Sequence, residues 1–313
     1  MKAPVVQSGI RVSTNASERD ENILVTVLHE PSVRAELTTY SQDSKDIMKS
    51  ARTCRVGVIG YGAIGVPVVA GITTGRVTGA VLEGIISRSP LRSAPAKQLD
   101  LTEALESCDL LVECAGQEAL VEHAEVVLRA GVDLLVTSIG ALADREFSKQ
   151  LNAAGPGRLF LTSGAVGGLD LLSSGARAGG YDRVTITTTK LPGSLVQPWM
   201  NEALVEEIRN ARGPLDVYEG SAAEAALLFP KSLNAGAAVA IAVNNWDAVT
   251  VRVRADPAAE LTSHVIEASG TIGEYRFEIR NKPSEDNPRT SGVVPFAVLR
   301  SLESIIGGRG GLI

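Results

Sequence analysis

The feature that most constrains the fold is a glycine-rich loop at residues 60–65, which reads Gly-Tyr-Gly-Ala-Ile-Gly. It directly follows the apolar run 55–59 and directly precedes a helical stretch. In such a G-x-G-x-x-G pattern the first glycine permits a tight turn, the second lets a pyrophosphate approach the backbone, and the third lets helix and strand pack closely. The pattern therefore predicts a dinucleotide site, with a simple strand-to-helix turn as the alternative. The predicted cofactor-binding residues are Gly60, Gly62, Ala63, Ile64 and Gly65.

The region around this loop repeats one pattern between residues 54 and 163. Short apolar runs at 80–87, 109–116 and 132–138 alternate with stretches of helical periodicity. Strands that alternate with helices at this spacing are typical of βαβ units. We therefore predict an α/β fold whose first domain, residues 54–163, is a Rossmann-type doubly wound parallel sheet.

The end of the second predicted strand bears on the choice between NAD and NADP. Domains of this type that bind NAD usually place an Asp or Glu there, which accepts a hydrogen bond from the ribose 2′-hydroxyl. This chain has Ser87, Arg88 and Ser89 instead. An arginine can bind a 2′-phosphate, so Arg88 is a predicted cofactor-binding residue, and a solvent-exposed loop charge is the alternative.

Beyond residue 163 the pattern changes to strands in which polar and apolar residues alternate, at 184–190, 248–255 and 274–280. Such strands suit an antiparallel or mixed sheet with one covered face. We predict a second domain over residues 164–290. The segment 291–313 is expected to form a helix that packs back on the first domain, and residues 1–53 form an extension of unknown role.

Composition excludes several classes of partner. The net charge of −6 and the aromatic content of 4% argue against a nucleic-acid partner. The chain has no apolar run of about 18 residues and no signal-peptide pattern near its start, so we expect a cytoplasmic protein with no membrane partner. The cysteines, Cys54, Cys108 and Cys114, lack metal-binding spacing, which favours free thiols and no metal site.

The three histidines are the candidate proton carriers near neutral pH. His29 lies in the extension, and His123 lies on the polar side of a helical stretch. His264 follows the break at Asp256-Pro257 and enters an apolar run, where a strand would point it toward the cofactor cleft. A half-exposed structural histidine is the alternative from periodicity alone.

The stretch 55–306 resembles the L-aspartate dehydrogenase family almost continuously. The segments that carry the resemblance are GYGAIG (60–65), VECAGQEAL (112–120), SIGALADREF (138–147), SGAVGGLD (163–170), EGSAAEAALLFPKSLN (219–234), ADPAAELTSH (255–264) and NPRTS (287–291). The resemblance implies an α+β second domain like that of dihydrodipicolinate reductase, used for catalysis and dimerisation. It also implies a homodimer or higher oligomer. The implied reaction is the oxidation of L-aspartate to iminosuccinate, a possible precursor for NAD biosynthesis.

By position, the resemblance implies that His264 is the active-site acid or base and that Ala165 and Asn234 contact the nicotinamide cofactor. The chain departs from the family at Thr262, where an Asn is usual, and in its N-terminal extension. These departures leave other small amino or oxo diacids open as substrates.

The chemistry of such a reaction needs a base, a cofactor and donors for two carboxylates. Lys190, Arg289 and Thr290 are the predicted substrate-binding residues, and exposed surface charge is the alternative for the two cations. The Asn234 side chain has both an acceptor and donors and could bind the carboxamide of the nicotinamide. The alternative is that Asn234 caps the N-terminus of a helix, a position where Asn is common. The alternatives to an aspartate dehydrogenase are a dehydrogenase or imine reductase for another diacid and a non-catalytic cofactor-binding sensor.

Overall fold

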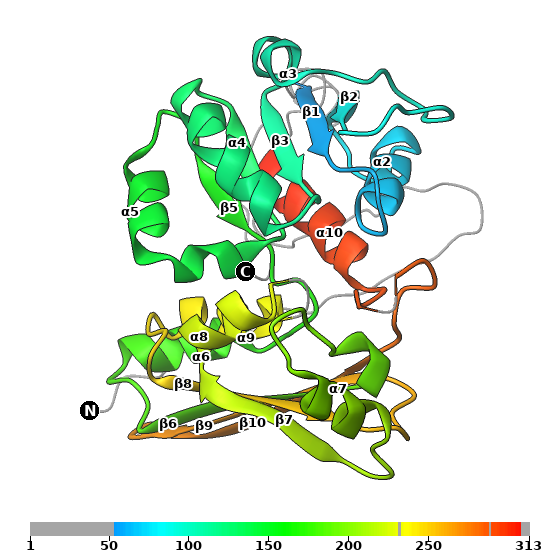
Figure 1. Ribbon diagram of the computed structural model, residues 1–313. Coiled ribbons are helices and arrows are strands. Elements are labelled where there is room, and N and C mark those ends of the chain that lie inside the picture. Colours follow the sequence, from blue (N-terminus) through cyan, green and yellow to red (C-terminus); the bar gives the residue numbers. More distant parts are fainter. Residues whose placement is uncertain (1–52, 231–232, 288, 308–313) are drawn as a thin grey trace, which may run out of the picture. The chain divides into compact units, whose positions relative to one another are not determined.

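The computed structural model describes residues 53–230, 233–287 and 289–307, which contain two five-stranded sheets (Figure 1). The predicted extension at 1–53, with His29, lies outside the described residues apart from Thr53. The same holds for Lys231, Ser232 and Pro288 of the resembling segments.

The first sheet is parallel throughout, with the strand order β2-β1-β3-β4-β5. Its strands are β1 (Cys54–Ile59), β2 (Ala80–Ile86), β3 (Leu110–Glu113), β4 (Asp133–Val136) and β5 (Leu159–Leu161). Its connections include α2 (Gly65–Thr73), α3 (Leu101–Ser107), α4 (Gln117–Arg129), the 3₁₀ helix η1 (Ile139–Ala143) and α5 (Arg145–Ala153). The predicted Rossmann-type sheet is confirmed, and β2 ends one residue before Ser87.

Helix α10 (Val294–Gly307) packs on α2 of this first sheet. Leu299 of α10 shares a buried apolar cluster with Val68 and Ile72 of α2. A Cβ on Gly71 would lie 2.5 Å from a methyl carbon of Leu299, so the glycine is what permits this close approach.

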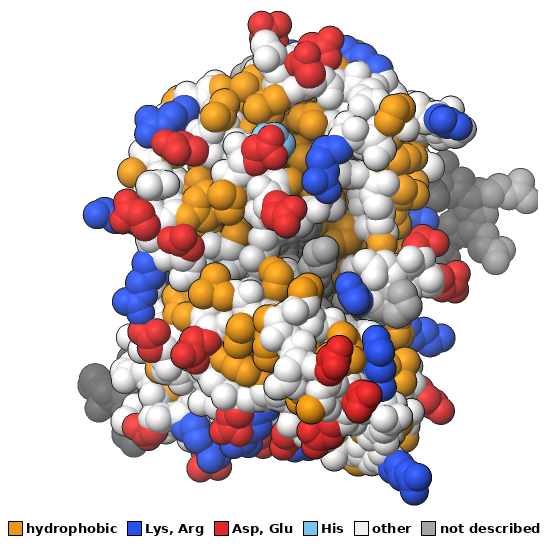
Figure 2. All heavy atoms as spheres, in the orientation of Figure 1, with side chains coloured by type: hydrophobic (Ala, Val, Ile, Leu, Met, Phe, Trp, Pro, Cys, Tyr) orange, Lys and Arg blue, Asp and Glu red, His pale blue; other side chains and the backbone are white. Residues whose placement is uncertain are grey.

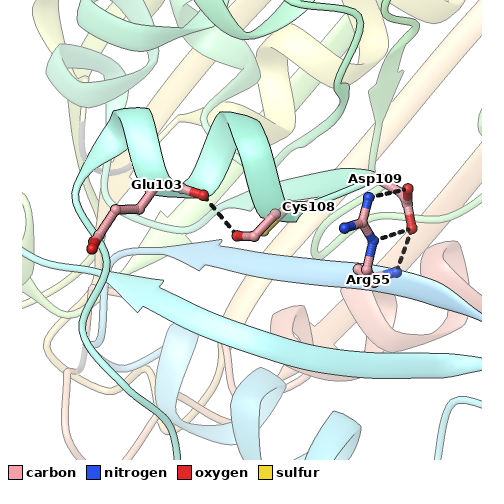
Figure 3. Close-up of polar contacts among 5 residues, drawn as sticks. Arg55, Glu103, Cys108 and Asp109 are labelled. Carbon is pink, nitrogen blue, oxygen red and sulfur yellow. Dashed lines mark hydrogen bonds and ion pairs between the residues drawn. The ribbon is translucent and has the colours of Figure 1, made fainter.

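The amino ends of β1 and β3 are joined by an ion pair (Figure 3). The Asp109 carboxylate accepts from the backbone N–H of Arg55 at 2.8 Å and from its guanidinium at 2.9 and 3.2 Å. Cys54 and Cys108 lie in the same region as free thiols. Burial, with the nearby Asp109 charge, raises the pKa of Cys54 to about 11, so this thiol is unreactive at neutral pH.

The second sheet has the order β10-β9-β6-β8-β7, in which β6 and β8 are parallel and the other pairs are antiparallel. Its strands are β6 (Arg183–Lys190), β7 (Leu215–Ser221), β8 (Val249–Ala255), β9 (Thr262–Gly270) and β10 (Gly273–Asn281). The accompanying helices are α6 (Leu169–Arg177), η2 (Pro192–Ser194), α7 (Glu202–Arg209), α8 (Ala222–Leu228) and α9 (Asn234–Ala242). The predicted α+β domain with a mixed sheet is confirmed.

Helices α6, α8 and α9 lie over one face of the second sheet (Figure 1). Helix α8 begins with the predicted capping box, in which Ser221 and Glu224 each accept from the other's backbone N–H. Helices α8 and α9 also contact η1 of the first domain. This contact brings the covered face of the second sheet toward the carboxyl ends of the first.

The described part of the chain contains no helix that is long and apolar enough to span a bilayer. On the face drawn in Figure 2, acidic and basic side chains of the described residues are interspersed.

Candidate active site

A cavity of about 300 Å³ lies at the carboxyl ends of the first sheet. Loops that follow β1, β3, β4 and β5 form one wall, and residues of the second domain form the other. In open α/β sheets, ligands bind outside the carboxyl ends of the strands, so this is the expected place for a cofactor and its substrate. The predicted residues that line it are Gly62, Ala63, Ile64, Ala165, Lys190, Asn234, His264, Arg289 and Thr290.

The glycine loop has the shape that a pyrophosphate requires. Gly60 has a φ of +96°, which favours glycine, and a Cβ on Gly65 would clash with the carbonyl oxygen of Gly60. A Cβ on Gly62, by contrast, would meet no atom within 4 Å and would enter the cavity. Gly60 and Gly65 therefore shape the turn, while Gly62 leaves open space in front of the first turn of α2.

A second cavity of about 300 Å³ adjoins the first and shares Gly62, Cys114 and Ala115 with it. Gly60 and the exposed Arg88 lie on its wall, and the Ser87 carbonyl accepts from the Gln98 side chain at 2.7 Å. Residues 87–89 thus border the space next to the glycine loop, where the adenosine half of a dinucleotide belongs.

His123 also lines this second cavity, which was not expected from its place on the polar side of a helical stretch. Ala119, four residues earlier on α4, lines the same cavity. Because residues four apart share a helix face, Ala119 and His123 present the same side of α4 to this cavity.

His264 lies on β9 and is 2% exposed. Its Nδ1 lies 3.0 Å from Oγ1 of Thr188, the residue directly opposite on β6. The alternative of a half-exposed histidine is therefore wrong. The side chain is buried because it lies on the same face of β9 as Ile266 and Ala268, which are also buried.

Lys190, at the end of β6, is 4% exposed and donates to the backbone carbonyl of Arg289 at 3.0 Å. The surface-charge alternative is wrong for Lys190, whereas Arg289 is exposed. Burial, and next the Arg289 charge, lower the pKa of Lys190 to about 8. Burial, and next the Lys190 charge, lower the pKa of His264 to about 3, so a neutral imidazole lies beside an ammonium group at neutral pH.

Asn234 is the first residue of α9, but it does not cap the helix. The residue before α9 is Leu233, and Oδ1 of Asn234 accepts from the backbone N–H of Gly140 in η1 at 3.0 Å. The N-cap alternative is therefore wrong, because a partner 94 residues away uses the oxygen. The side-chain NH₂ group of Asn234 can still donate to a ligand.

Comparison with known proteins gives the family of the chain. The family described as "Aspartate dehydrogenase, C-terminal" matches residues 170–305, and "Homoserine dehydrogenase, NAD binding domain" matches residues 60–156. The L-aspartate dehydrogenase of Ruegeria pomeroyi is 37% identical over 260 residues, which cover 79% of this chain and 91% of that protein. That of Serratia proteamaculans is 34% identical over 264 residues, covering 81% and 98%. The chain belongs to the L-aspartate dehydrogenase family.

A solved structure of the family has the same fold. The crystal structure of aspartate dehydrogenase from Thermotoga maritima superposes with a TM-score of 0.65 at 27% identity, covering 83% of this chain and 98% of that one. As a member of the family, the chain is an NAD(P)-dependent oxidoreductase with a small-molecule substrate. Within the described ranges, no group of three or more His, Cys, Asp or Glu side chains is arranged to hold a metal ion.

Proposed function

We propose that this chain oxidises L-aspartate to iminosuccinate with NAD or NADP and catalyses the reverse reductive amination. The observation that carries the proposal is the cavity that joins the glycine loop to His264 and the buried Lys190. A dianionic substrate suits this cavity, because its carboxylates would compensate a lysine charge that burial has separated from water. The names of the relatives support the same substrate.

In this proposal Lys190, Arg289 and Thr290 bind the two carboxylates. Lys190 carries a charge below about pH 8, and Arg289 and Thr290 line the same cavity. The substrate also affects His264, because its negative charges offset the Lys190 charge that contributes to the low pKa of the imidazole. Substrate binding therefore shifts the pKa of His264 upward from the value that burial and the Lys190 charge set together.

His264 accepts the proton that the substrate ammonium group must lose, and it returns a proton in the reverse direction. For this role Nε2 must be unprotonated, so Nδ1 carries the hydrogen and donates to Oγ1 of Thr188, 3.0 Å away. A bound nicotinamide supplies the hydride acceptor. Asn234 and Ala165 border the cavity on the side where we place the carboxamide, and Arg88 would bind a 2′-phosphate.

The proposal extends to a cytoplasmic homodimer or higher oligomer. Helices α6, α8 and α9 lie over one face of the second sheet, and the opposite face presents ion pairs between its strands, such as Arg252 with Glu219 at 2.8 Å. Light scattering on the purified protein would give its mass in solution, and a monomer would contradict this part of the proposal.

A substrate panel tests the function. Purified enzyme is incubated with NAD or NADP and each of L-aspartate, L-glutamate, L-malate and L-alanine, and with oxaloacetate plus ammonia and the reduced cofactor. We expect the highest kcat/KM with L-aspartate. A preference for another diacid would point to an altered substrate, in keeping with the buried Thr262 two residues before His264. Cofactor binding without turnover of any substrate would indicate a sensor.

A further inference from the structure

Glu113, the last residue of β3, is a carboxylate with no exposed surface. It lies between the loop that follows β3 and the loop that follows β4. The first of these loops begins at Cys114 and leads into α4, and the second begins at Thr137 and leads into η1. Both loops line the cavity that holds His264 and Lys190.

The carboxylate accepts five hydrogen bonds, and these come from both loops. Oε1 accepts from the backbone N–H groups of Ala115 and Gly116 at 2.8 and 2.7 Å and from the Ser138 hydroxyl at 2.9 Å. Oε2 accepts from the backbone N–H groups of Thr137 and Ser138 at 3.2 and 3.0 Å. Every partner in these contacts is a hydrogen-bond donor. The Glu113 side chain therefore acts only as an acceptor, as a carboxylate does.

Three of these backbone N–H groups, on Ala115, Gly116 and Ser138, lie past the end of the strand ladder, where a buried N–H without a partner is costly. The Thr137 N–H also donates to the Glu113 backbone carbonyl at 3.3 Å. Glu113 supplies that partner for both loops at once, which fixes their separation. The position of the second loop in turn affects Asn234, which lines the cavity, because the two are linked by hydrogen bonds. Ser138 directly precedes η1, and Gly140 of η1 donates to Oδ1 of Asn234 at 3.0 Å.

We infer that Glu113 is a positioning residue for the nicotinamide half of the cofactor, acting through the loops that follow β3 and β4. The inference rests on the proposed function, because it assigns the nicotinamide to the cavity that contains His264. Of the residues that donate to Glu113, Gly116, Thr137 and Ser138 line the cavity that contains His264 and not the second cavity, whereas Ala115 lines both. The adenosine half is bordered instead by residues 87–89 and His123.

The test compares two ligands in two variants. NAD carries the nicotinamide, and ADP-ribose lacks it but keeps the pyrophosphate and adenosine. Glu113→Gln keeps the shape but replaces one acceptor oxygen by an N–H donor that faces other donors. Calorimetry on Glu113→Gln should show NAD weakened about ten-fold or more, the effect of one lost hydrogen bond to a charged group, and ADP-ribose weakened less than about three-fold.

Asp133→Asn is the matched control. Asp133 lies at the opposite, amino end of β4, where its carboxylate accepts from the backbone N–H of Arg158 at 2.8 Å and pairs with its guanidinium at 2.6 Å. This variant should lower the melting temperature but leave the ratio of NAD to ADP-ribose affinity unchanged. The inference would be overturned if Glu113→Gln lost affinity for NAD and ADP-ribose equally, or if its loss of NAD affinity did not exceed that of the control.

A milder variant covers the case in which Glu113→Gln does not fold. Ser138→Ala removes one of the five donors and leaves the four backbone contacts in place. It should weaken NAD by about three-fold without weakening ADP-ribose, and an unchanged ratio here would also count against the inference. These binding measurements do not involve aspartate. If the wild-type protein did not oxidise aspartate, that result would refute the proposed function but not the inference about Glu113.

Discussion

At the scale of single residues, the site combines three neighbouring side chains of the second sheet. Thr188 and Lys190 lie on β6, and His264 lies opposite Thr188 on β9. All three are buried. In the proposed function, Thr188 orients the imidazole of His264, and Lys190 provides the charge that a carboxylate substrate offsets.

The first prediction concerns the proton carrier. His264→Ala should lower kcat by about 10²–10⁴, the usual contribution of a positioned acid or base, and leave NAD affinity nearly unchanged. Thr188→Val should lower kcat by about ten-fold through loss of orientation, and Thr188→Ser should restore it. Steady-state kinetics and calorimetry measure both effects. Full activity in His264→Ala would rule out the assigned role.

The second prediction concerns the burial of Lys190. Its folded pKa of about 8 lies below the ordinary value of 10.5, so between these values the unfolded chain binds more protons and stability rises with pH. The stability of wild type relative to Lys190→Met should therefore rise by roughly 3 kcal/mol as the pH is raised from 7 to above 10.5, with most of the change between pH 8 and 10.5. Urea unfolding of both proteins at several pH values measures this. A difference that does not change with pH would contradict the assignment.

The third prediction concerns cofactor choice. Arg88 borders the second cavity, and its guanidinium can donate two charge-assisted hydrogen bonds to a 2′-phosphate. The enzyme should therefore accept NADP at least as well as NAD. Arg88→Ala should weaken NADP by about ten-fold or more and change NAD little. The measurement is kcat/KM with each cofactor in wild type and Arg88→Ala. If the variant lost kcat/KM equally for NAD and NADP, or lost none, Arg88 would not have this role.

At the scale of elements, the glycine loop between β1 and α2 gives a prediction with an internal control. Gly62→Val should abolish cofactor binding but leave the melting temperature nearly unchanged, because a side chain there enters open space. Gly65→Val should lower the melting temperature as well, because its Cβ would clash with the Gly60 carbonyl. Thermal unfolding and calorimetry distinguish the two. Retained NAD affinity in Gly62→Val would mean that the loop is only structural.

Most elements could be predicted from local pattern, and the exceptions have physical causes. Strand β7 was missed because an irregularity between Asp216 and Tyr218 breaks the alternation of its side chains. The parallel pairing of β6 and β8 was also not specified, because strand patterns do not reveal partners far along the chain.

At the scale of the whole molecule, the site depends on contacts that join distant parts of the chain. The sequence placed Lys190, Asn234 and His264 among the candidates, and the structure brings them to one cavity. It could not show that Asn234 bonds to Gly140, because the partner lies on another element. Glu113 was missed for the same reason, since Thr137 and Ser138, which donate to it, belong to the loop that follows the neighbouring strand β4.

The central claim is that the enzyme removes a hydride from Cα of L-aspartate, with the carboxylates bound near Lys190 and the proton accepted by His264. Turnover of L-aspartate carrying deuterium at Cα tests it most directly, with mass spectrometry of the reduced cofactor. The account predicts that wild-type enzyme transfers the deuterium to NADH or NADPH and that His264→Ala does so at least about a hundred-fold more slowly. Reduced cofactor without deuterium, or no reduction by wild-type enzyme, would contradict it.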